Sequence, residues 1–339
     1  MGKPTLSRTV WVNRLYMCTG SAEDLHSLSC KPFDPWKTKR HRECEFGTRV
    51  RKGKLDTSGL GDVKVWRWPG KGVYVIFGRK PQHESSFWCE GLVVYHQWIA
   101  QVSADPGLKE DDPWRLNNGG PLAVLPDMTT HRYPGNPPYV MEKNWMPFLY
   151  TDPGTRVEHL YVTYYVQPHI VFEVFPNGSA LHRWTTPAPN LMAQFQHYDV
   201  HGGPPVVYVP AKQSITGLPH YLGIMHHIER FDDNRVRLYR HFLFTLAPAP
   251  PFAITAISDE LPLVFNKLHK EHTHWVAFVS GLCTGAHGSV YITYGSADIQ
   301  SRLLILSLEH IKSLFSGQIK FTEYDIKLQP SDAHKLKVG

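Results

Sequence analysis

The sequence has no long apolar run. No stretch approaches the roughly 18 consecutive apolar residues that a membrane-spanning helix needs, so no membrane span is predicted. The first residues have no apolar core and include Arg8, Arg14 and Asp24, which is not the pattern of a secretory signal peptide. These absences predict a cytoplasmic protein.

Cysteine is scarce and has no metal-binding spacing. The five cysteines are Cys18, Cys30, Cys44, Cys89 and Cys283, and we expect them to be reduced and mostly buried. Because four of them precede residue 90, an N-terminal disulfide in a protein of the secretory-pathway lumen remains an alternative. The stretch 177–179 is a glycosylation sequon, but its Asn-Gly pair between two apolar runs first indicates a hairpin turn.

The patterns of metal and cofactor sites are missing as well. His269, His272 and His274 lie close together, but Glu271 would point to the other face of a strand and Lys270 would repel a cation. No Gly-rich phosphate loop opens a helix, and no Ser-His-Asp arrangement is recognisable. We therefore predict no metal site and no cofactor, and interpret the histidine cluster as a surface loop.

Positive charge is present but not concentrated. The formal net charge is +6 and the pI is near 8.9, yet only residues 37–42 and 49–54 form basic clusters. A solvated N-terminal segment explains both clusters, and contact with an anionic ligand or with nucleic acid is the alternative. No nucleic-acid partner is predicted.

Helical periodicity is nearly absent, and short β-prone segments fill the chain instead. Only Leu308 to Phe315 places its apolar residues on one helical face. More than a dozen short strands, separated by turns rich in the 27 prolines and 26 glycines, indicate an all-β sandwich or propeller. The absence of a linker favours a single-domain β-propeller over residues 51–330, preceded by an irregular segment at 1–50 and followed by a tail at 331–339.

One stretch, residues 142–169, combines polar side chains with a clear strand pattern. Its second half, from Leu160, alternates and is rich in aromatic and β-branched residues, as expected for a strand entering a hairpin. Its first half places Glu142, Lys143, Asn144 and Trp145 in a row before a Pro-Phe break. Such a row suggests a site on the rim of a scaffold, and a solvated loop with one buried tryptophan is the alternative.

Seven short motifs in this order resemble one family of sugar-active proteins. The motifs cover residues 142–148, 168–169, 202–204, 222–226, 251–252, 280–282 and 294–298. Together they are similar to the five-bladed β-propeller β-mannoside phosphorylases and the related β-1,2-mannosyltransferases. The resemblance covers about residues 60–315, and it implies five blades and a site in the axial funnel.

The resemblance also implies a single aspartate as the catalytic acid. The family's acid opens a strand within a Glu-Asp-Pro-Arg motif, and the matching position is Asp62. Gly61 and Val63 replace the flanking Glu and Pro, and Lys64 replaces the Arg, so the neighbours that set the ionisation of the acid differ. A turn-capping role for Asp62 is the alternative.

Inverting transfer at an anomeric carbon needs an acid for the leaving oxygen and a nucleophile on the opposite ring face. Asp62 is the candidate acid. Asp298 is the second candidate catalytic carboxylate, which would orient sugar hydroxyls or act as a base, and a turn residue is the alternative.

A phosphate or sugar phosphate needs converging cationic and amide donors. The candidates within the matched motifs are Lys143, Asn144, His169 and His226, although each histidine alone is more often structural. Trp145 and Tyr294 are candidates for stacking on sugar faces, and burial is the commoner fate of such aromatic residues.

These observations predict an inverting glycosyltransferase or glycoside phosphorylase that acts on mannosides. The expected partners are a sugar, a sugar phosphate or nucleotide sugar, and inorganic phosphate. The alternative is a catalytically weak or inactive glycan-binding propeller.

Overall fold

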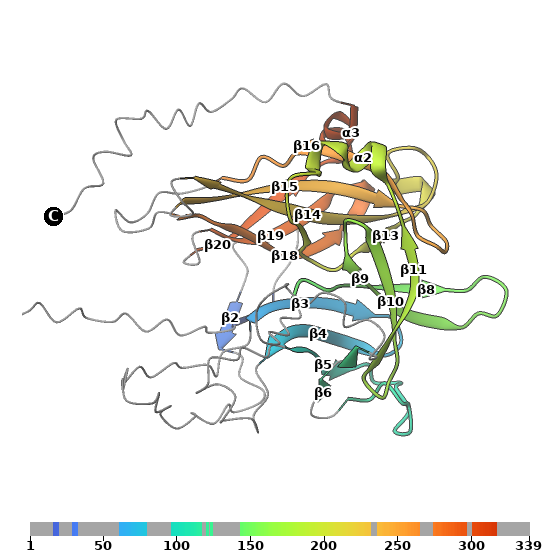
Figure 1. Ribbon diagram of the computed structural model, residues 1–339. Helices are drawn as coiled ribbons and strands as arrows, with labels where there is room; N and C mark the ends of the chain where they lie inside the picture. Colours follow the sequence, from blue (N-terminus) through green and yellow to red (C-terminus); the bar gives the residue numbers. More distant parts are fainter. Residues whose placement is uncertain are drawn as a thin grey trace, which may run out of the picture. The chain divides into compact units, whose positions relative to one another are not determined.

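The structure of the protein is a computed structural model (Figure 1). It describes residues 16–19, 29–32, 61–79, 96–116, 120–121, 123–124, 143–231, 236–264, 274–296 and 300–316. Asp298, Glu142, His269 and His272 lie outside these described residues.

Strands form most of the regular structure of the described chain, which confirms the all-β prediction (Figure 1). The strands before residue 143 are β1 (Tyr16–Thr19), β2 (Ser29–Pro32), β3 (Gly61–Trp68), β4 (Gly72–Arg79), β5 (His96–Ala104), β6 (Gly120–Pro121) and β7 (Ala123–Val124). The later strands are β8 (Met146–Thr151), β9 (Glu158–Tyr165), β10 (His169–Val174), β11 (Ser179–Thr186), β12 (Val200–Gly202), β13 (Val207–Val209), β14 (His220–Phe231), β15 (Val236–Leu246), β16 (Ile254–Glu260), β17 (His274–Trp275), β18 (Ala277–Thr284), β19 (Val290–Ser296) and β20 (Gln300–Leu306).

The described helices are few and short. They are α2 (Pro189–Met192), α3 (Leu308–Ser316) and the 3-10 turns η3 (Ala193–Phe195), η4 (Ala211–Gln213) and η5 (Ala286–Gly288). The apolar face of α3 buries Ile311 and Leu314, so the one helix predicted from periodicity is confirmed.

The chain divides into two compact units. The first unit comprises residues 1–63, 67–143 and 176–179, and the second comprises residues 64–66, 144–175 and 180–339. The middle of β3, Lys64–Trp66, thus groups with the second unit.

The first unit contains a sheet in which β3, β4, β5 and β6 pair in chain order. Alternating residues of β4 and β5, including Val75, Phe77 and Ala100, form its apolar cluster. Trp68 packs against Tyr74 and Trp114, and the Tyr74 hydroxyl donates to the Trp114 carbonyl at 2.9 Å. In the N-terminal segment predicted to be irregular, β1 and β2 pair antiparallel and place Cys18 opposite Cys30.

In the second unit, three groups of strands pair mainly with their neighbours in sequence. Strands β8, β9, β10 and β11 pair in chain order, and so do β18, β19 and β20. The third group has the order β12-β14-β15-β16, with β13 also on β14 and β17 parallel to β15. The predicted hairpin turn is confirmed at Gly178, which has a φ of 84°.

Strands β14 and β15 are buried on both faces. Met225 and Phe244 face one apolar cluster, which also contains Phe148 and Phe252. Ile224 and Leu243 face the other cluster, which includes Val279 of β18. Polar residues on these strands are therefore enclosed unless they lie near a strand end.

One sequence interpretation of local structure is wrong. The Pro-Phe pair at 147–148 does not break the chain but lies inside β8, where Phe148 packs edge-on against Phe252 at 5.1 Å. His201 and Gly202 belong to the short strand β12. No sheet of the described strands closes on itself, so the five-bladed propeller stays a prediction.

Candidate functional site

Three of the sequence motifs meet around the short strand β12. A Cβ atom on Gly202 would lie 2.7 Å from the Asn144 carbonyl oxygen and 2.8 Å from the Met146 side chain. A Cβ atom on Gly203 would lie 3.1 Å from the Val279 carbonyl oxygen and 3.6 Å from that of Ile224. The lack of a side chain at Gly202 permits the approach to Asn144, and Gly203 packs closely on Val279, so the motifs 142–148, 202–204 and 222–226 come together.

Asn144 has an unusual environment within this group. Its φ is 62°, a left-handed conformation that only a few per cent of non-glycine residues adopt and that asparagine tolerates better than most. Its side-chain Oδ1 is buried, and none of the described residues donates a hydrogen bond to it. A strained backbone with an unused buried acceptor is a feature that suggests a binding role.

A row of three histidines crosses the sheet beside this group. The register pairs His201 of β12 with His226 of β14, and His226 with His241 of β15. The ring centroids of His201 and His226 are 5.7 Å apart, and those of His226 and His241 are 5.3 Å apart. Tyr239 stacks on His226 at 5.5 Å and Phe278 of β18 contacts it edge-on at 5.9 Å.

The inner two histidines are enclosed and electrically neutral. His226 is 3% exposed and His241 is 1% exposed. Burial, followed by the charges of neighbouring histidines and of Lys64, holds the pKa of His226 well below its ordinary value. Burial lowers the pKa of His241 to about 3, against a weak opposing effect of the Tyr239 carbonyl, and neither ring nitrogen has a well-formed hydrogen bond to a described residue.

The outer histidine is different because it pairs with a carboxylate. His201 Nε2 lies 3.0 Å from Asp199 Oδ2, and the side chains are 29% and 48% exposed. The hydroxyl of Tyr165, at the end of β9, donates to Asp199 Oδ1 at 3.1 Å. The hydrogen bond from His201, more than any other contact, lowers the pKa of Asp199. The sequence did not single out Asp199, His201 or His241, although the Asp-Val-His spacing at 199–201 places two polar side chains on one face of a strand.

His169 lies away from this row and is held by two threonines. Its Nε2 and Nδ1 atoms are each 3.2 Å from a hydroxyl oxygen, that of Thr163 and that of Thr186 respectively. It is 1% exposed, and burial lowers its pKa to about 3. His169 is therefore a neutral residue with both ring nitrogens engaged.

The two candidate stacking residues are enclosed. Trp145 has no exposed surface and makes edge contacts with Tyr164 and Phe172. Tyr294 is 5% exposed, and its hydroxyl accepts a hydrogen bond from the Val264 amide at 3.3 Å. Both rings pack within the second unit.

Two of the remaining candidates, Asp62 and Lys143, lie in the first unit. Asp62 is the second residue of β3, is partly exposed and has a φ of 52°. Lys143 is exposed and immediately precedes Asn144. Lys64, which stands at the arginine position of the acid motif, has no exposed surface and belongs to the second unit.

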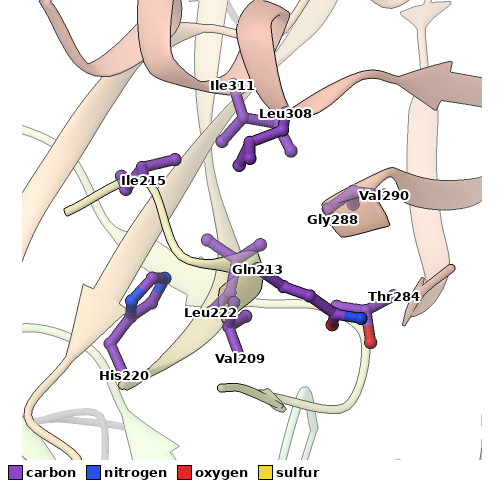
Figure 2. Close-up of a pocket in the computed structure, with 10 residues that line it drawn as sticks. All are labelled: Val209, Gln213, Ile215, His220, Leu222, Thr284, Gly288, Val290, Leu308 and Ile311. Atoms are coloured by element: carbon purple, nitrogen blue, oxygen red, sulfur yellow. The ribbon is translucent and has the colours of Figure 1, made fainter. Parts of the chain in front are cut away.

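A small cavity lies elsewhere in the second unit (Figure 2). Its volume is about 10 Å³, and Leu222, Ile311, His220 and Gln213 are among the residues around it. This volume is at the lower limit for one water molecule, so the cavity does not hold a sugar.

The described residues contain neither a metal-binding cluster nor a membrane-spanning helix. Across the part of the chain that the structure describes, no three His, Cys, Asp or Glu side chains are grouped so as to hold a metal ion. Neither of the described α-helices has the length and apolar character to cross a bilayer.

Comparison with known proteins gives structural similarities only. No family model matches the sequence, and no curated protein matches it. A glycosyl hydrolase from Bacteroides ovatus has a TM-score of 0.40 at 11% identity, with 87% of this chain and 79% of the hydrolase covered.

Two structures from Leishmania mexicana are also similar to this chain, with lower TM-scores than the hydrolase. A GDP-Man-dependent mannosyltransferase has a TM-score of 0.39 at 12% identity, covering 73% of this chain and 68% of its own. A mannose phosphorylase in complex with phosphate ion has a TM-score of 0.28 at 10% identity, covering 73% and 83%. All three neighbours are carbohydrate-active enzymes.

Proposed function

We propose that the protein is carbohydrate-active, and that it is an inverting glycosyltransferase or glycoside phosphorylase acting on mannosides. The observation that carries the proposal is the left-handed backbone conformation of two polar residues in the motifs. Asp62 and Asn144 are two of only five described non-glycine residues with positive φ. Such conformations cost about 1–3 kcal/mol each and cluster at functional sites, so their coincidence with the motifs supports a retained site.

Asp62 has the role of general acid in this proposal. Its protonated carboxyl group gives the proton to the leaving glycosidic oxygen as the bond from that oxygen to the anomeric carbon breaks. Phosphate, or the hydroxyl of an acceptor whose proton passes to Asp298 as base, attacks the same carbon from the opposite face and forms the new bond. Lys143 and Asn144 contact the anionic group, and Asp298 orients sugar hydroxyls.

The proposed roles of the histidines and aromatic residues are narrower. His169 and His226 are buried and neutral, so they support the site by position and hydrogen bonding instead of by charge. Trp145 and Tyr294 shape the scaffold beneath the site, since their rings are enclosed.

Asp62→Asn tests the enzymatic reading. The variant keeps the shape and a hydrogen-bonding group but cannot deliver a proton, so turnover should fall by about 10²–10⁴-fold with sugar affinity little changed. Turnover is measured as phosphate-dependent release of sugar 1-phosphate, and as transfer from mannosyl donors, across a panel of mannosides. Asp111→Asn, at an exposed carboxylate of the same unit, is the control and should behave as the wild type.

A glycan-binding protein without turnover is the second candidate. The altered surroundings of Asp62 favour it: Gly61 replaces a glutamate of the resembled motif, and Lys64 is wholly buried with its charge acting on His226. Three results together would establish this second function in place of the first. The wild type would bind mannosides, it would turn over none of them, and Asp62→Asn would bind them with the same affinity.

We also propose that the sheets are blades of a five-bladed propeller. Strands β3–β6, β8–β11 and β18–β20 each pair in chain order, as the strands of a propeller blade do. An experimental structure in which these sheets do not surround a common axis would contradict this arrangement.

A further inference from the structure

We propose that His201, held in place by Asp199, binds a hydroxyl group of the sugar ligand. The inference rests on the proposed function for the class of ligand. It starts from accessibility: His226 and His241 are enclosed and neutral, whereas 29% of the His201 side chain is exposed. His201 is thus the member of the histidine row that a ligand in solvent can reach.

The hydrogen bonds fix which nitrogen faces a ligand. A carboxylate only accepts hydrogen bonds, so Nε2 of His201 carries the hydrogen that it donates to Asp199 Oδ2 at 3.0 Å. Asp199 is itself oriented by the Tyr165 hydroxyl at 3.1 Å. Both carboxylate oxygens are engaged, and the Nδ1 atom of His201 remains for another partner.

A hydroxyl group suits Nδ1 in either protonation state of the ring. A neutral ring with hydrogen on Nε2 offers a lone pair at Nδ1 and accepts a hydrogen bond from the hydroxyl. A protonated ring offers an N–H and donates to the hydroxyl oxygen instead. An oxyanion without an O–H group lacks this versatility, because it only accepts hydrogen bonds and is bound at Nδ1 only by the protonated ring.

The position of His201 connects it with the rest of the candidate site. The next residue, Gly202, packs against the carbonyl of Asn144, whose own side-chain oxygen is buried without a described donor. A polyhydroxylated ligand lying on β12 would meet His201 beside this segment. Asp199 and Tyr165 are positioning residues in this arrangement, because they act on the ligand through His201.

Two measurements test the inference. Calorimetric titration with mannobiose compares the wild type with His201→Phe, which keeps the ring size and removes the nitrogen atoms. Loss of one hydrogen bond should weaken binding on the order of 10-fold. The control is His197→Phe, at an exposed histidine of the same unit, and it should leave the affinity unchanged.

The second measurement detects contact between the ligand and His201 in the wild-type protein, so it does not depend on the folding of a variant. In the wild type, the ring ¹⁵N and ¹³C resonances of His201 should shift on addition of mannobiose at both pH 6 and pH 8, and those of His197 should not. Asp199→Ala should broaden or move the same signals in the free protein, because the ring loses its fixed orientation.

The outcomes separate the two proposals. Wild-type binding with no shift at His201, and equal affinity in His201→Phe, would overturn the role of His201 and leave the carbohydrate function standing. Absence of binding to any mannoside would overturn both. Binding of inorganic phosphate at His201 in place of the sugar would overturn the hydroxyl assignment.

Discussion

Lys143 is the exposed cation among the residues proposed to contact an anionic group. His169 and His226 are neutral in the folded protein, and Asn144 carries no charge. Electrostatic attraction of phosphate by these four residues therefore depends on a single lysine. Because this lysine is exposed, added salt should screen its effect.

Lys143→Ala should weaken the binding of inorganic phosphate or a phosphorylated donor by about 1.5–3 kcal/mol, the contribution of one charge-assisted hydrogen bond. Calorimetric titration at two salt concentrations measures both the loss and its screening. Lys109→Ala, at another exposed lysine of the first unit, is the matched control. Equal phosphate affinity in the two variants would mean that Lys143 is a solvated surface residue.

The sequence named several candidate site residues but did not predict their surroundings. The order of the motifs identified Asn144 and His226, and the structure gives both unusual environments. Their burial depends on which faces of β14 and β15 are covered, and a single sequence does not show this. Asp199 and His201 were not among the candidates because neither belongs to the seven motifs, although their i, i+2 spacing is visible in the sequence.

At the scale of elements, the position of the three-residue strand β12 depends on Gly202, because this residue has no side chain that would keep the neighbouring segment away. Gly202 lets β12 approach the chain at Asn144 and Met146, where any Cβ atom would be 2.7–2.8 Å from its neighbours. The neighbour at 2.7 Å is a backbone carbonyl, which cannot rotate away as a side chain can. The approach of β12 to the 142–148 motif therefore requires glycine.

Gly202→Ala should destabilise the protein by about 1–3 kcal/mol, the usual cost of overpacking a close contact, and should weaken ligand binding at the same time. Urea-induced unfolding and mannoside titration measure the two effects. Gly295→Ala in β19 is the control, since its Cβ atom would have no neighbour within 4 Å. A Gly202→Ala variant as stable as this control would show that β12 is not held by the close approach.

Strands and turns followed from local pattern wherever the pattern was strong. Alternation of β-branched and aromatic residues identified β9, β10 and β11, and the Asn-Gly pair identified their turn. β8 was missed because Pro147 suggested a break, yet Phe148 is anchored by Phe252 from a distant part of the sequence. Such tertiary contacts determine the secondary structure of segments whose local sequence signals conflict.

At the scale of the whole molecule, buried histidines make stability depend on pH. His169 and His241 have pKa values of about 3 in the folded protein because burial disfavours their charged forms. The pKa values of His220, His226 and His227 are also lowered, mainly by burial. In the unfolded chain these side chains regain a pKa near 6.5.

The sign of the effect follows from proton binding. Below about pH 6.5 the unfolded chain binds protons that the folded protein excludes, so stability is complete above this pH and is lost as the pH falls toward 3. Each strongly shifted histidine should remove about 1.4 kcal/mol per pH unit across that range. The lowered pKa of Asp199 acts in the same direction, at a lower pH.

Urea-induced unfolding at pH 7.5, 7.0, 6.0 and 5.0 measures this dependence. The free energy of unfolding should be nearly constant between pH 7.5 and 7 and should fall steeply from pH 6 to pH 5. His241→Phe keeps an aromatic ring of similar size and removes one titrating group, so its curve should be shallower by about 1.4 kcal/mol per pH unit. His197→Gln changes an exposed histidine and should leave the slope of the wild type intact. If the stability of the wild type does not change between pH 7.5 and pH 5, solvent reaches the buried histidines. The description of His226 and His241 as enclosed and neutral would then be wrong.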